Sequence, residues 1–477
     1  MISQDAVVAA NRFGFGASPE AMAAIAKNPR TWVKRQIVPE KHVPAPLAAL
    51  PSTMDDQLAF FLWLRDYRKE IQSTDEAMKG SVEKSYVKAL YPRYQTAVKA
   101  RFDTAVATDT PVFERLVHFW SNHFVVSGAK PVAIALPPSF ERDAIRPYVT
   151  GKFADMLLAV VKHPAMLIYL DNTRSIGPHS EWARNPPKRP QQFAGVPAPT
   201  GLNENLAREI LELHTVGAHG GYDQADVTSF ANVITGWQVL SPRQFARFAA
   251  RWIGIGNDLF HFNAAAHESG AHTVMGKTYA AGGVEQGEAV LRDLARHPST
   301  ARFIATKLAR HFVADEPPEA VIARLAAVFR ETDGDLGAVT LTLIDSPEAW
   351  AEPRSKLKQP EEYLISAVRT MGGPPLVGRQ LMASLNEMGQ RPYMSPGPDG
   401  WSDQQDYWLS PDGVWKRIEW AQLAGRALAG SITQPDVFAD GVFGATLSSD
   451  TRTVIGRAES QAQAVALLLT SPEFMRR

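Results

Sequence analysis

Residues 203–222 read NENLAREILELHTVGAHGGY and place many polar side chains on a helical pattern. At about 100° per residue, the polar side chains fall within an arc of roughly 140° and the apolar ones occupy the opposite side. The polar set is Glu204, Asn205, Arg208, Glu209 and Glu212, and the apolar set is Leu206, Ile210, Leu211 and Leu213. Asn203 suits the N-cap and Gly217 suits the end, so the stretch predicts an amphipathic helix over 204–216.

The polar stripe of this helix has two interpretations. In the functional one, the acids act as acid, base or ligand groups, Arg208 orients a carboxylate, phosphate or sulfate group, and the asparagines contact substrate. The candidate catalytic residues are then Glu204, Arg208, Glu209 and Glu212, with Asn203 and Asn205 as substrate contacts. In the structural one, the stripe is a solvated face whose spaced ion pairs each contribute about 0.2–0.5 kcal/mol. His214 lies in the apolar arc, so we expect it to be buried and hydrogen-bonded.

Composition excludes several classes of protein. The chain has 477 residues, equal numbers of basic and acidic residues at 50 each, and no cysteine. The balanced charge argues against a nucleic-acid binder, and the missing cysteines exclude disulfides and thiolate metal sites. The start, MISQDAVVAANRFGFG, lacks the regions of a secretory signal, and no segment approaches the ~20 apolar residues of a membrane span. We expect a cytoplasmic protein by default, or a periplasmic one if it is exported with a partner.

Amphipathic windows dominate the chain and predict a mostly α, multi-helical fold with little sheet. The expected organisation is an N-terminal helical region (1–174), a proline-rich loop (175–201) and a C-terminal helical region (202–477), or one continuous domain. Candidate helices cover 19–27, 30–37, 54–72, 76–106, 111–126, 140–149, 152–161, 204–216, 223–236, 284–296, 299–314, 318–331, 335–345, 359–371, 377–388 and 412–429.

Two further segments carry candidate site residues. Asp171 and Asn172 precede the proline-rich loop, and closure of that loop brings them near the helix at 204, where they can contact substrate. In PVFERLVHFWSNHF, Glu114 and His118 are four residues apart, a spacing that suits a metal ligand, a general base or an ordinary surface pair. His123 points away from His118 and is expected in the core or between helices.

The segment FHFNAAAHESGAHTVMGKTY is the best local candidate for a metal site. It holds His261, His267 and His272 within twelve residues, together with Glu268. Imidazole and carboxylate ligands suit zinc, iron or manganese, although the spacing matches no closed metal motif. The metal-site hypothesis uses His267 and His272 with His118, and the alternative is a loop of unliganded histidines.

Aromatic residues concentrate near the C-terminus, at Trp401, Tyr407, Trp408, Trp415 and Trp420. Aromatic rings beside carboxylates are what a sugar-binding groove needs, and Trp401 is the candidate substrate contact among them. Anchoring of the core and of the loop at 389–413 explains the same residues equally well.

Several long motifs resemble the bacterial family called domain of unknown function 1800. They are NRFGFGASPE, ERLVHFWSNHF, RDAIRPYVTGKFADMLLAVVKHPAMLIYLDN, NENLAREILELHTVGAHGGY, DVTSFANVITGW, HPSTARFIATKLARHFV and SPEF, and together they span nearly the whole chain. The resemblance implies a companion from a sulfatase-like family, number 1501, that often carries an export signal. The family commonly reads Trp-His-Asn-His where this chain has Trp120-Ser121-Asn122-His123, which puts metal binding by this helix in doubt.

Two functions follow as hypotheses. The first is a hydrolase or related enzyme, with a divalent transition metal as its candidate cofactor, acting on a glycan or other polymeric substrate. The second is a non-enzymatic helical scaffold or maturation partner of the sulfatase-like protein, with the aromatic C-terminal region as its interface.

Overall fold

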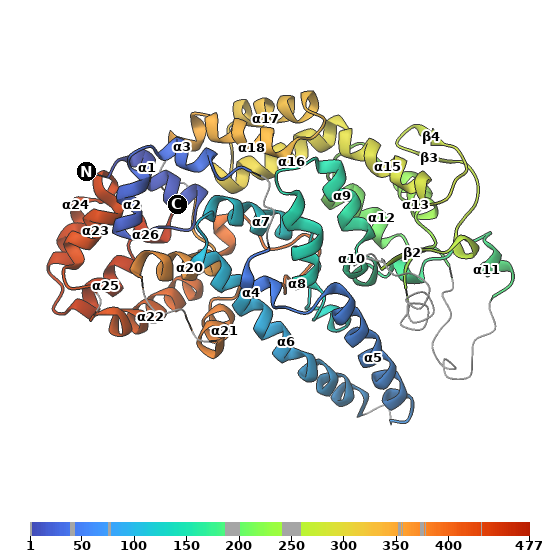
Figure 1. Cartoon of the computed structure of the whole chain (residues 1–477), viewed down its shortest axis with the longest axis horizontal. Helices are drawn as coiled ribbons and strands as arrows, with labels where there is room; N and C mark the ends of the chain where they lie inside the picture. The colour runs from blue at the N-terminus through green and yellow to red at the C-terminus, as the bar shows by residue number, and fades with distance from the viewer. Residues whose placement is uncertain are drawn as a thin grey trace.

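The computed structural model of the chain describes residues 2–38, 43–74, 78–186, 201–240, 259–351, 354, 356–372, 376, 378–430 and 432–477. Helices dominate this part of the chain, and the strands described there form two small two-stranded sheets (Figure 1). The expected mostly α fold is therefore confirmed. No described helix combines the length and the apolar character that crossing a bilayer requires.

The described α-helices overlap every expected window and also include several short helices before residue 360 that no window predicted. They are α1 (Gln4–Val8), α2 (Pro19–Ile25), α3 (Pro29–Lys34), α4 (Ala45–Ala48), α5 (Thr53–Gln72), α6 (Lys79–Ala107), α7 (Pro111–His123), α8 (Pro137–Phe140), α9 (Phe153–Lys162), α10 (Pro164–Tyr169), α11 (Glu181–Arg184), α12 (Asn205–Glu209), α13 (Gln224–Val233), α15 (Val284–Arg296), α16 (Pro298–Phe312), α17 (Glu319–Glu331), α18 (Leu336–Asp345), α19 (Glu348–Ala351), α20 (Pro360–Met371), α21 (Gly378–Glu387), α22 (Pro411–Leu428), α23 (Pro435–Phe443), α24 (Ser449–Gly456), α25 (Gln461–Leu469) and α26 (Pro472–Met475).

In the described residues, three π-helical segments and several short 3-10 turns interrupt or join these helices. The π segments are η1 (Ala9–Phe13), η4 (Glu141–Ile145) and η8 (Ile210–His214). The 3-10 turns are η3 (Pro131–Ala133), η5 (Arg146–Tyr148), η6 (Asn172–Arg174), η9 (Ala264–Ala266), η10 (Gln405–Tyr407) and η11 (Gly444–Thr446). The helix expected over 204–216 thus begins as α12 and continues as η8, because one extra residue per turn enters at Ile210.

The two described sheets are antiparallel pairs of strands. β1 (Trp237–Val239) pairs with β2 (Phe260–Phe262) in the register Trp237 to Phe262, and β3 (His272–Val274) pairs with β4 (Lys277–Tyr279) in the register His272 to Tyr279. Both lie in the region of the histidine-rich segment, so that segment is part sheet and part turn.

Helix starts in this chain are set by proline and by short polar caps. Proline occupies the first turn of α2, α7, α16, α20 and α22, where its missing N–H has no intrahelical partner to lose. Ser52 and Asp55 form a reciprocal capping box at the start of α5. These signals lie in the local sequence, which is why the helix starts were predictable.

Helix α7 lies near the middle of the molecule, whereas α5 and α6 project from the body together as an arm (Figure 1). Side chains on all sides of α7 are buried, including Phe113, Leu116, Phe119 and Trp120. A polar residue on such a helix cannot turn to bulk water and must find an internal partner or an internal cavity.

The beginning and the end of the described chain pack against each other. Ala445 N–H donates to the Ile2 carbonyl, and α2 packs against α23. Buried contacts also join the two expected helical regions, since Arg115 of α7 binds Glu362 of α20. Within the proline-rich loop, α11 and its flanks are described up to residue 186, and residues 187–200 lie outside the described chain.

Candidate functional site

A cavity lies between α6, α7, the end of α16, the first turn of α20 and the loop at 390–403. About 80 Å³ of it is open to the centre of a water-sized molecule, which is room for several waters or for part of a small ligand. The lining residues that carry polar or aromatic groups are Phe15, Arg101, Arg115, His118, Phe119, Ser121, Asn122, Phe140, His311, Gln359, Glu361, Glu362, Gln390, Tyr393, Ser395, Trp401 and Asp403.

Helix α7 supplies one wall through residues that share a helical stripe. Arg115, His118 and Asn122 are spaced three and four apart and all line the cavity. Because the rest of α7 is packed in the core, this stripe is held rigidly. The sequence pattern that pointed to His118 therefore identified one wall of a real cavity.

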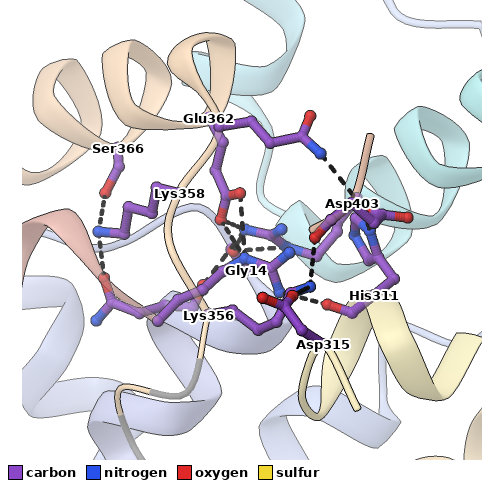
Figure 2. A network of polar contacts seen from close by, with 12 residues as sticks. Gly14, His311, Asp315, Lys356, Lys358, Glu362, Ser366 and Asp403 are labelled. Atoms are coloured by element: carbon purple, nitrogen blue, oxygen red, sulfur yellow. Dashed lines mark hydrogen bonds and ion pairs between the residues drawn. The ribbon is translucent and has the colours of Figure 1, made fainter. Parts of the chain in front are cut away.

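His311 and Asp403 form a hydrogen-bonded pair on the cavity wall (Figure 2). His311 Nδ1 lies 2.7 Å from Asp403 Oδ1, and Gln359 Nε2 donates to the same oxygen at 3.3 Å. Lys356 Nζ holds the Asp403 backbone carbonyl at 2.5 Å. His311 Nε2 is buried and has no hydrogen-bond partner. With Nδ1–H donated to a carboxylate, Nε2 of the neutral ring carries a lone pair.

The electrostatics of this pair keep the carboxylate charged and the imidazole neutral. Burial alone would raise the pKa of Asp403, but His311, Lys356 and Arg477 bring it below its ordinary value. Burial lowers the pKa of His311 to about 4 and outweighs the opposing effect of Asp403. At neutral pH the pair is thus an ionised carboxylate and a neutral imidazole.

His118 presents a second neutral imidazole to the same cavity. Burial, followed by Arg101 and Arg146, lowers the pKa of His118 well below its ordinary value. His118 Nε2 has no hydrogen bond and lies 3.8 Å from Glu114 Oε1, which is held by Arg146 at 2.6 Å. The ring is therefore available to a ligand rather than committed to the acid one turn away.

The charged residues of the wall neutralise one another through ion pairs that are almost fully buried. Arg101 bridges Glu141, at 2.9 Å, and Glu361. Glu362 accepts from Arg115 at 2.5 Å and from Arg477 at 2.8 Å, in the network shown in Figure 2. Burial opposes ionisation of Glu362, yet the two guanidinium groups lower its pKa to about 2. The wall is charged but internally paired.

Two π-helical segments position parts of this network. Gly14, directly after η1, turns its carbonyl to Arg115 Nε at 2.9 Å, and Asn11 of η1 accepts from Lys358 at 2.9 Å. Glu141, the partner of Arg101, begins η4. A π segment redirects carbonyls and side chains that an α-helix would use internally, and such segments occur often at functional sites.

The loop that closes the cavity is fixed to α7 and carries local strain. Asn122 and Trp401 exchange two 2.8 Å hydrogen bonds between the Asn122 amide and the Trp401 backbone. Gly400 has φ +85° and packs where a Cβ would lie 2.5 Å from the Asn122 carbonyl oxygen, so only glycine fits. Tyr393 adopts φ +62° and donates from its hydroxyl to Glu141 at 2.8 Å. Trp401 Nε1 is buried without a partner.

Most of the predicted acid stripe on α12 lies at a different place, between α12 and α13. Glu204 accepts from Thr228 at 2.6 Å, from Gln224 at 2.9 Å and from Arg208 at 3.1 Å. Arg208 also donates to Gln224, so its guanidinium group is already engaged. Glu212 accepts from the Tyr222 hydroxyl at 3.4 Å. None of these residues lines the cavity.

Glu209 is the one stripe residue in an unusual electrostatic environment. Burial, then Glu212 and Asp399, raise the pKa of Glu209 to about 7. Asp399 belongs to the same loop as Tyr393 and Trp401, so a charge of the cavity loop acts on this residue of the stripe. The predicted role of Glu209 as an acid or base stays a prediction.

Of the four predicted substrate contacts other than Trp401, Asn203, Asp171 and Asn172 have structural partners for their side chains. Asn203 Oδ1 accepts from Asn205 N–H at 2.9 Å, in the manner of a cap, and the Asn205 side chain is exposed. Asp171 pairs with Lys130 at 2.8 Å. Asn172 is buried and donates to the carbonyls of Ile234 and Trp237. Trp401 alone of the predicted substrate contacts lines the cavity.

The predicted metal ligands are not gathered into one site. His267 lies between two carbonyl oxygens, with Nδ1 3.0 Å from Thr235 O and Nε2 3.1 Å from Gly282 O. His272 is in β3, and His118 faces the cavity. Within the described part of the chain, no three or more His, Cys, Asp or Glu side chains are grouped so that they could hold a metal ion.

His123, the last residue of α7, and His214 form a separate buried pair. His123 Nε2 donates to the His214 carbonyl at 3.1 Å, and the Nδ1 atom of each ring has no partner. Burial, and then Lys307, lower the pKa of His214 to about 3. The expected burial of His214 is confirmed, whereas its ring nitrogen Nδ1 lacks the expected hydrogen bond.

Sequence reasoning missed the residues that make up most of the cavity. Arg101, Arg115, His311, Glu361, Glu362 and Asp403 all line it, and none was a candidate. Two signals were present in the sequence: His311 lies near the end of the quoted motif at 297–313, and Asp403 follows Trp401 by two residues. Nothing local links the two, because their contact spans 92 positions.

Comparison with known proteins gives a family and no further relative. No curated protein and no solved structure matches the chain significantly. Ser121, at the position where the family resemblance leads one to expect histidine, lines the cavity beside His118. The family described as "Protein of unknown function (DUF1800)" matches residues 8–476, which confirms the resemblance seen in the sequence. The chain belongs to this DUF1800 family.

Proposed function

We propose that the chain is a hydrolytic enzyme that works by acid–base chemistry in the cavity between α7, α16, α20 and the loop at 390–403. One observation carries the proposal. His311 is held at Nδ1 by the ionised Asp403 and presents an unpartnered, buried Nε2 on the other side. A carboxylate that orients an imidazole in this way fixes the tautomer that a general base requires.

The reaction that this geometry supports begins with a water molecule in the cavity. His311 Nε2 takes a proton from the water, whose oxygen forms the new bond to the electrophilic atom of the substrate. The scissile bond breaks with its electron pair on the leaving oxygen, which takes the proton back from the imidazolium ring. Asp403 stays ionised and stabilises the imidazolium while it exists. Water is consumed and no other co-reactant is needed.

The remaining lining residues support binding and exclude bulk solvent. His118 offers a second neutral imidazole that can hydrogen-bond the substrate, and the aromatic rings of Phe15 and Phe119 provide apolar contact. Because the wall charges are paired with one another, the cavity can be polar without attracting counter-ions. The proposal assigns no role to a metal ion, since the His311–Asp403 pair supplies the base.

The substrate class that we propose is a carbohydrate-containing or other polymeric compound. The support for it is the aromatic cluster that begins at Trp401, which lines the cavity, and continues to Tyr407 and Trp408. Glu209, on which Asp399 of the same loop acts electrostatically, can take part in binding a longer substrate.

The test is a hydrolysis screen of the purified protein against chromogenic esters, glycosides and sulfate esters. Any activity that belongs to the cavity should fall about 10²- to 10⁴-fold in His311→Gln. His219→Gln is the matched control, because His219 is exposed and lies outside the cavity lining. If hydrolysis continues at the same rate in His311→Gln, the reaction does not take place in this cavity.

A partner of the sulfatase-like protein is a second candidate function, and one observation favours it. Helix α22 exposes Trp415 at 56% and Leu423 at 64% of their surfaces, and exposed apolar side chains on one helix can serve as interface contacts. Co-purification with the companion protein would test this role. A stable complex that is lost in a Trp415→Ser, Leu423→Ser variant and kept in His311→Gln would favour the partner over the enzyme.

A further inference from the structure

Two guanidinium groups of the cavity wall keep part of their hydrogen-bonding capacity unused. Arg101 of α6 donates from Nε to Glu141 and from Nη1 to Glu361. Arg115 of α7 donates from Nε to a backbone carbonyl and from Nη2 to Glu362. Among the described residues, none accepts a hydrogen bond from Arg101 Nη2 or Arg115 Nη1, and both atoms retain accessible surface. Since both side chains line the cavity, these nitrogens are its open donors.

Aromatic rings hold both guanidinium groups in place and leave an edge of each open. Cζ of Arg101 lies 5.2 Å from the ring centroid of Tyr393, and Cζ of Arg115 lies 4.5 Å from that of Phe15. Both rings also line the cavity. A guanidinium group that stacks on a ring has a restrained plane. The free N–H groups therefore have a fixed direction before any ligand arrives.

The charges of the two arginines act on the same part of the wall. Burial lowers the pKa of His118 most, and the charges of Arg101, Arg146 and Arg115 lower it further. Electrostatic effects fall off with distance, so the guanidinium groups of Arg101 and Arg115 both lie near this ring. A ligand group beside His118 thus faces two arginines from different helices.

The acids of the wall do not need the open edges, because other donors already hold them. Their set is Glu141, Glu361 and Glu362, paired with Arg101, Arg115 and Arg477. Asp403 is a further acid of the lining, and Lys356, bound to its backbone carbonyl, offsets its charge. Such a balanced wall attracts ions little over long distances. At contact distance, however, its free N–H groups favour an acceptor.

The number and charge of these donors specify the acceptor. Each free Nη carries two N–H groups, so the two edges offer about four donors. A carboxylate has two oxygens with about four lone-pair sites and can accept from both edges at once, whereas an amide has one oxygen. Its hydrogen bonds to guanidinium are also about twice as strong as those between neutral groups. A dianion would bring a second uncompensated charge into a balanced wall, which costs more.

We infer that the cavity binds the carboxylate group of an organic acid, held between Arg101 Nη2 and Arg115 Nη1. The limited volume of the cavity suits a carboxylate with a small part of its ligand inside and the remainder toward the opening. The inference goes beyond the proposed hydrolysis, because neither arginine edge needs His311 or turnover in order to bind.

The experiment compares acetate with acetamide, which has nearly the same shape and no charge. Each is titrated against the intact protein at constant ionic strength and followed by the NMR relaxation of its methyl signal, and sulfate, a dianion, is added as a competitor. We expect acetate to bind about tenfold or more tightly than acetamide, and sulfate to displace acetate only at about tenfold higher concentration.

Two variants locate the binding. Ser121→Leu places a larger side chain in the cavity, leaves every arginine in its ion pair, and should abolish acetate binding. Ser449→Leu is its control at an exposed serine outside the lining. Arg101→Lys keeps a charge between Glu141 and Glu361 but removes the open edge, so acetate should bind about tenfold more weakly.

Arg302→Lys, at an exposed arginine, is the control for the last variant and should bind acetate normally. Circular dichroism shows whether each variant is folded, and if Arg101→Lys is not, Ser121→Leu decides. The inference is overturned if acetamide binds as tightly as acetate, if sulfate binds more tightly, or if acetate binding survives in folded Ser121→Leu. No step of this test measures hydrolysis, so its result and that of the hydrolysis screen stand apart.

Discussion

The acid stripe of α12 and the first turn of α20 are both helical sites rich in carboxylates, yet they have opposite environments. Glu204, the residue before α12, finds Arg208, Gln224 and Thr228 within 24 positions of chain and stays near solvent. Glu361 and Glu362 on α20 are buried and take their arginines from positions 101, 115 and 477. The comparison teaches that density of charge along a sequence marks a local surface network, whereas a cavity draws its charges from distant segments.

The two regions should also differ strongly in energy. A solvated pair gains little because water competes for both charges, whereas a buried carboxylate between two guanidinium groups has no alternative partner. The following variants measure this difference, from the largest expected effect to the smallest.

Removing Glu362 should have the largest effect. Glu362→Ala leaves Arg115 and Arg477 buried without their shared carboxylate, and we expect the free energy of unfolding to fall by about 3–5 kcal/mol. Urea denaturation followed by circular dichroism measures it. Glu319→Ala removes an equivalent but exposed partner of Arg302 and should leave the urea midpoint unchanged. Equal midpoints for the two variants would contradict the distinction.

Asp403→Asn should preserve the fold around the cavity but abolish most of its catalytic activity. Loss of the charge removes the orientation and stabilisation of His311, so kcat should fall about 10²- to 10⁴-fold. The rate of the wild-type protein should drop as pH falls through about 4, where His311 becomes protonated. In the variant this drop should occur at lower pH, because the Asp403 carboxylate, which favours the protonated ring, has been removed. Asp399→Asn in the same loop is the control. If the rates of the variant and the wild-type protein drop at the same pH, Asp403 does not act through His311.

Protonation of His214 should lower the free energy of unfolding as the pH falls. In the unfolded chain this ring binds a proton below pH about 6.5, whereas in the folded chain its pKa is about 3, so its contribution to stability is present at neutral pH and lost as pH falls. Between pH 7 and pH 5 it should account for about 2 kcal/mol of lost stability. His214→Gln should flatten the pH dependence by that amount in urea titrations, and His219→Gln, at an exposed site, should not.

Glu204→Ala should have the smallest effect. The carboxylate has several partners but remains accessible to water, so we expect a loss of about 1 kcal/mol or less in the free energy of unfolding. Thermal unfolding at low and high salt checks this value, because a surface network weakens as salt rises. A loss as large as that of Glu362→Ala would erase the contrast between the two helices.

The helices were largely predictable because their signals are local. The window at 284–296 coincides with α15, and proline at the first turn marks α16, α20 and α22. No expected window covers α23 to α26, nor α1, α4, α10, α11 and α19 earlier in the chain. All of these helices are four to nine residues long, and helices this short give only a weak period. The π segment η8 was also invisible, since a single extra residue in a turn does not disturb the pattern of apolar side chains before it.

The candidate site was predictable only where its residues share an element. His118 could be found from its spacing to Glu114, and Trp401 from its aromatic neighbours. His311 and Asp403 are 92 positions apart, and Arg101 and Glu361 are 260 positions apart. No local pattern in the sequence around any of these residues predicts which distant residue it contacts. The polar stripe at 203–212 was visible in the sequence because its charged side chains find their hydrogen-bond partners at nearby positions of the chain.

The contact of Arg115 with Glu362 has a consequence for how the protein is made. The two residues are 247 positions apart. At 5–20 residues per second, about 12 to 50 s separate their synthesis on the ribosome. Throughout that interval Arg115 lacks its carboxylate, and the centre of the molecule cannot close around it. The buried pair, and the packing of α20 around it, therefore form only after α20 has been synthesised.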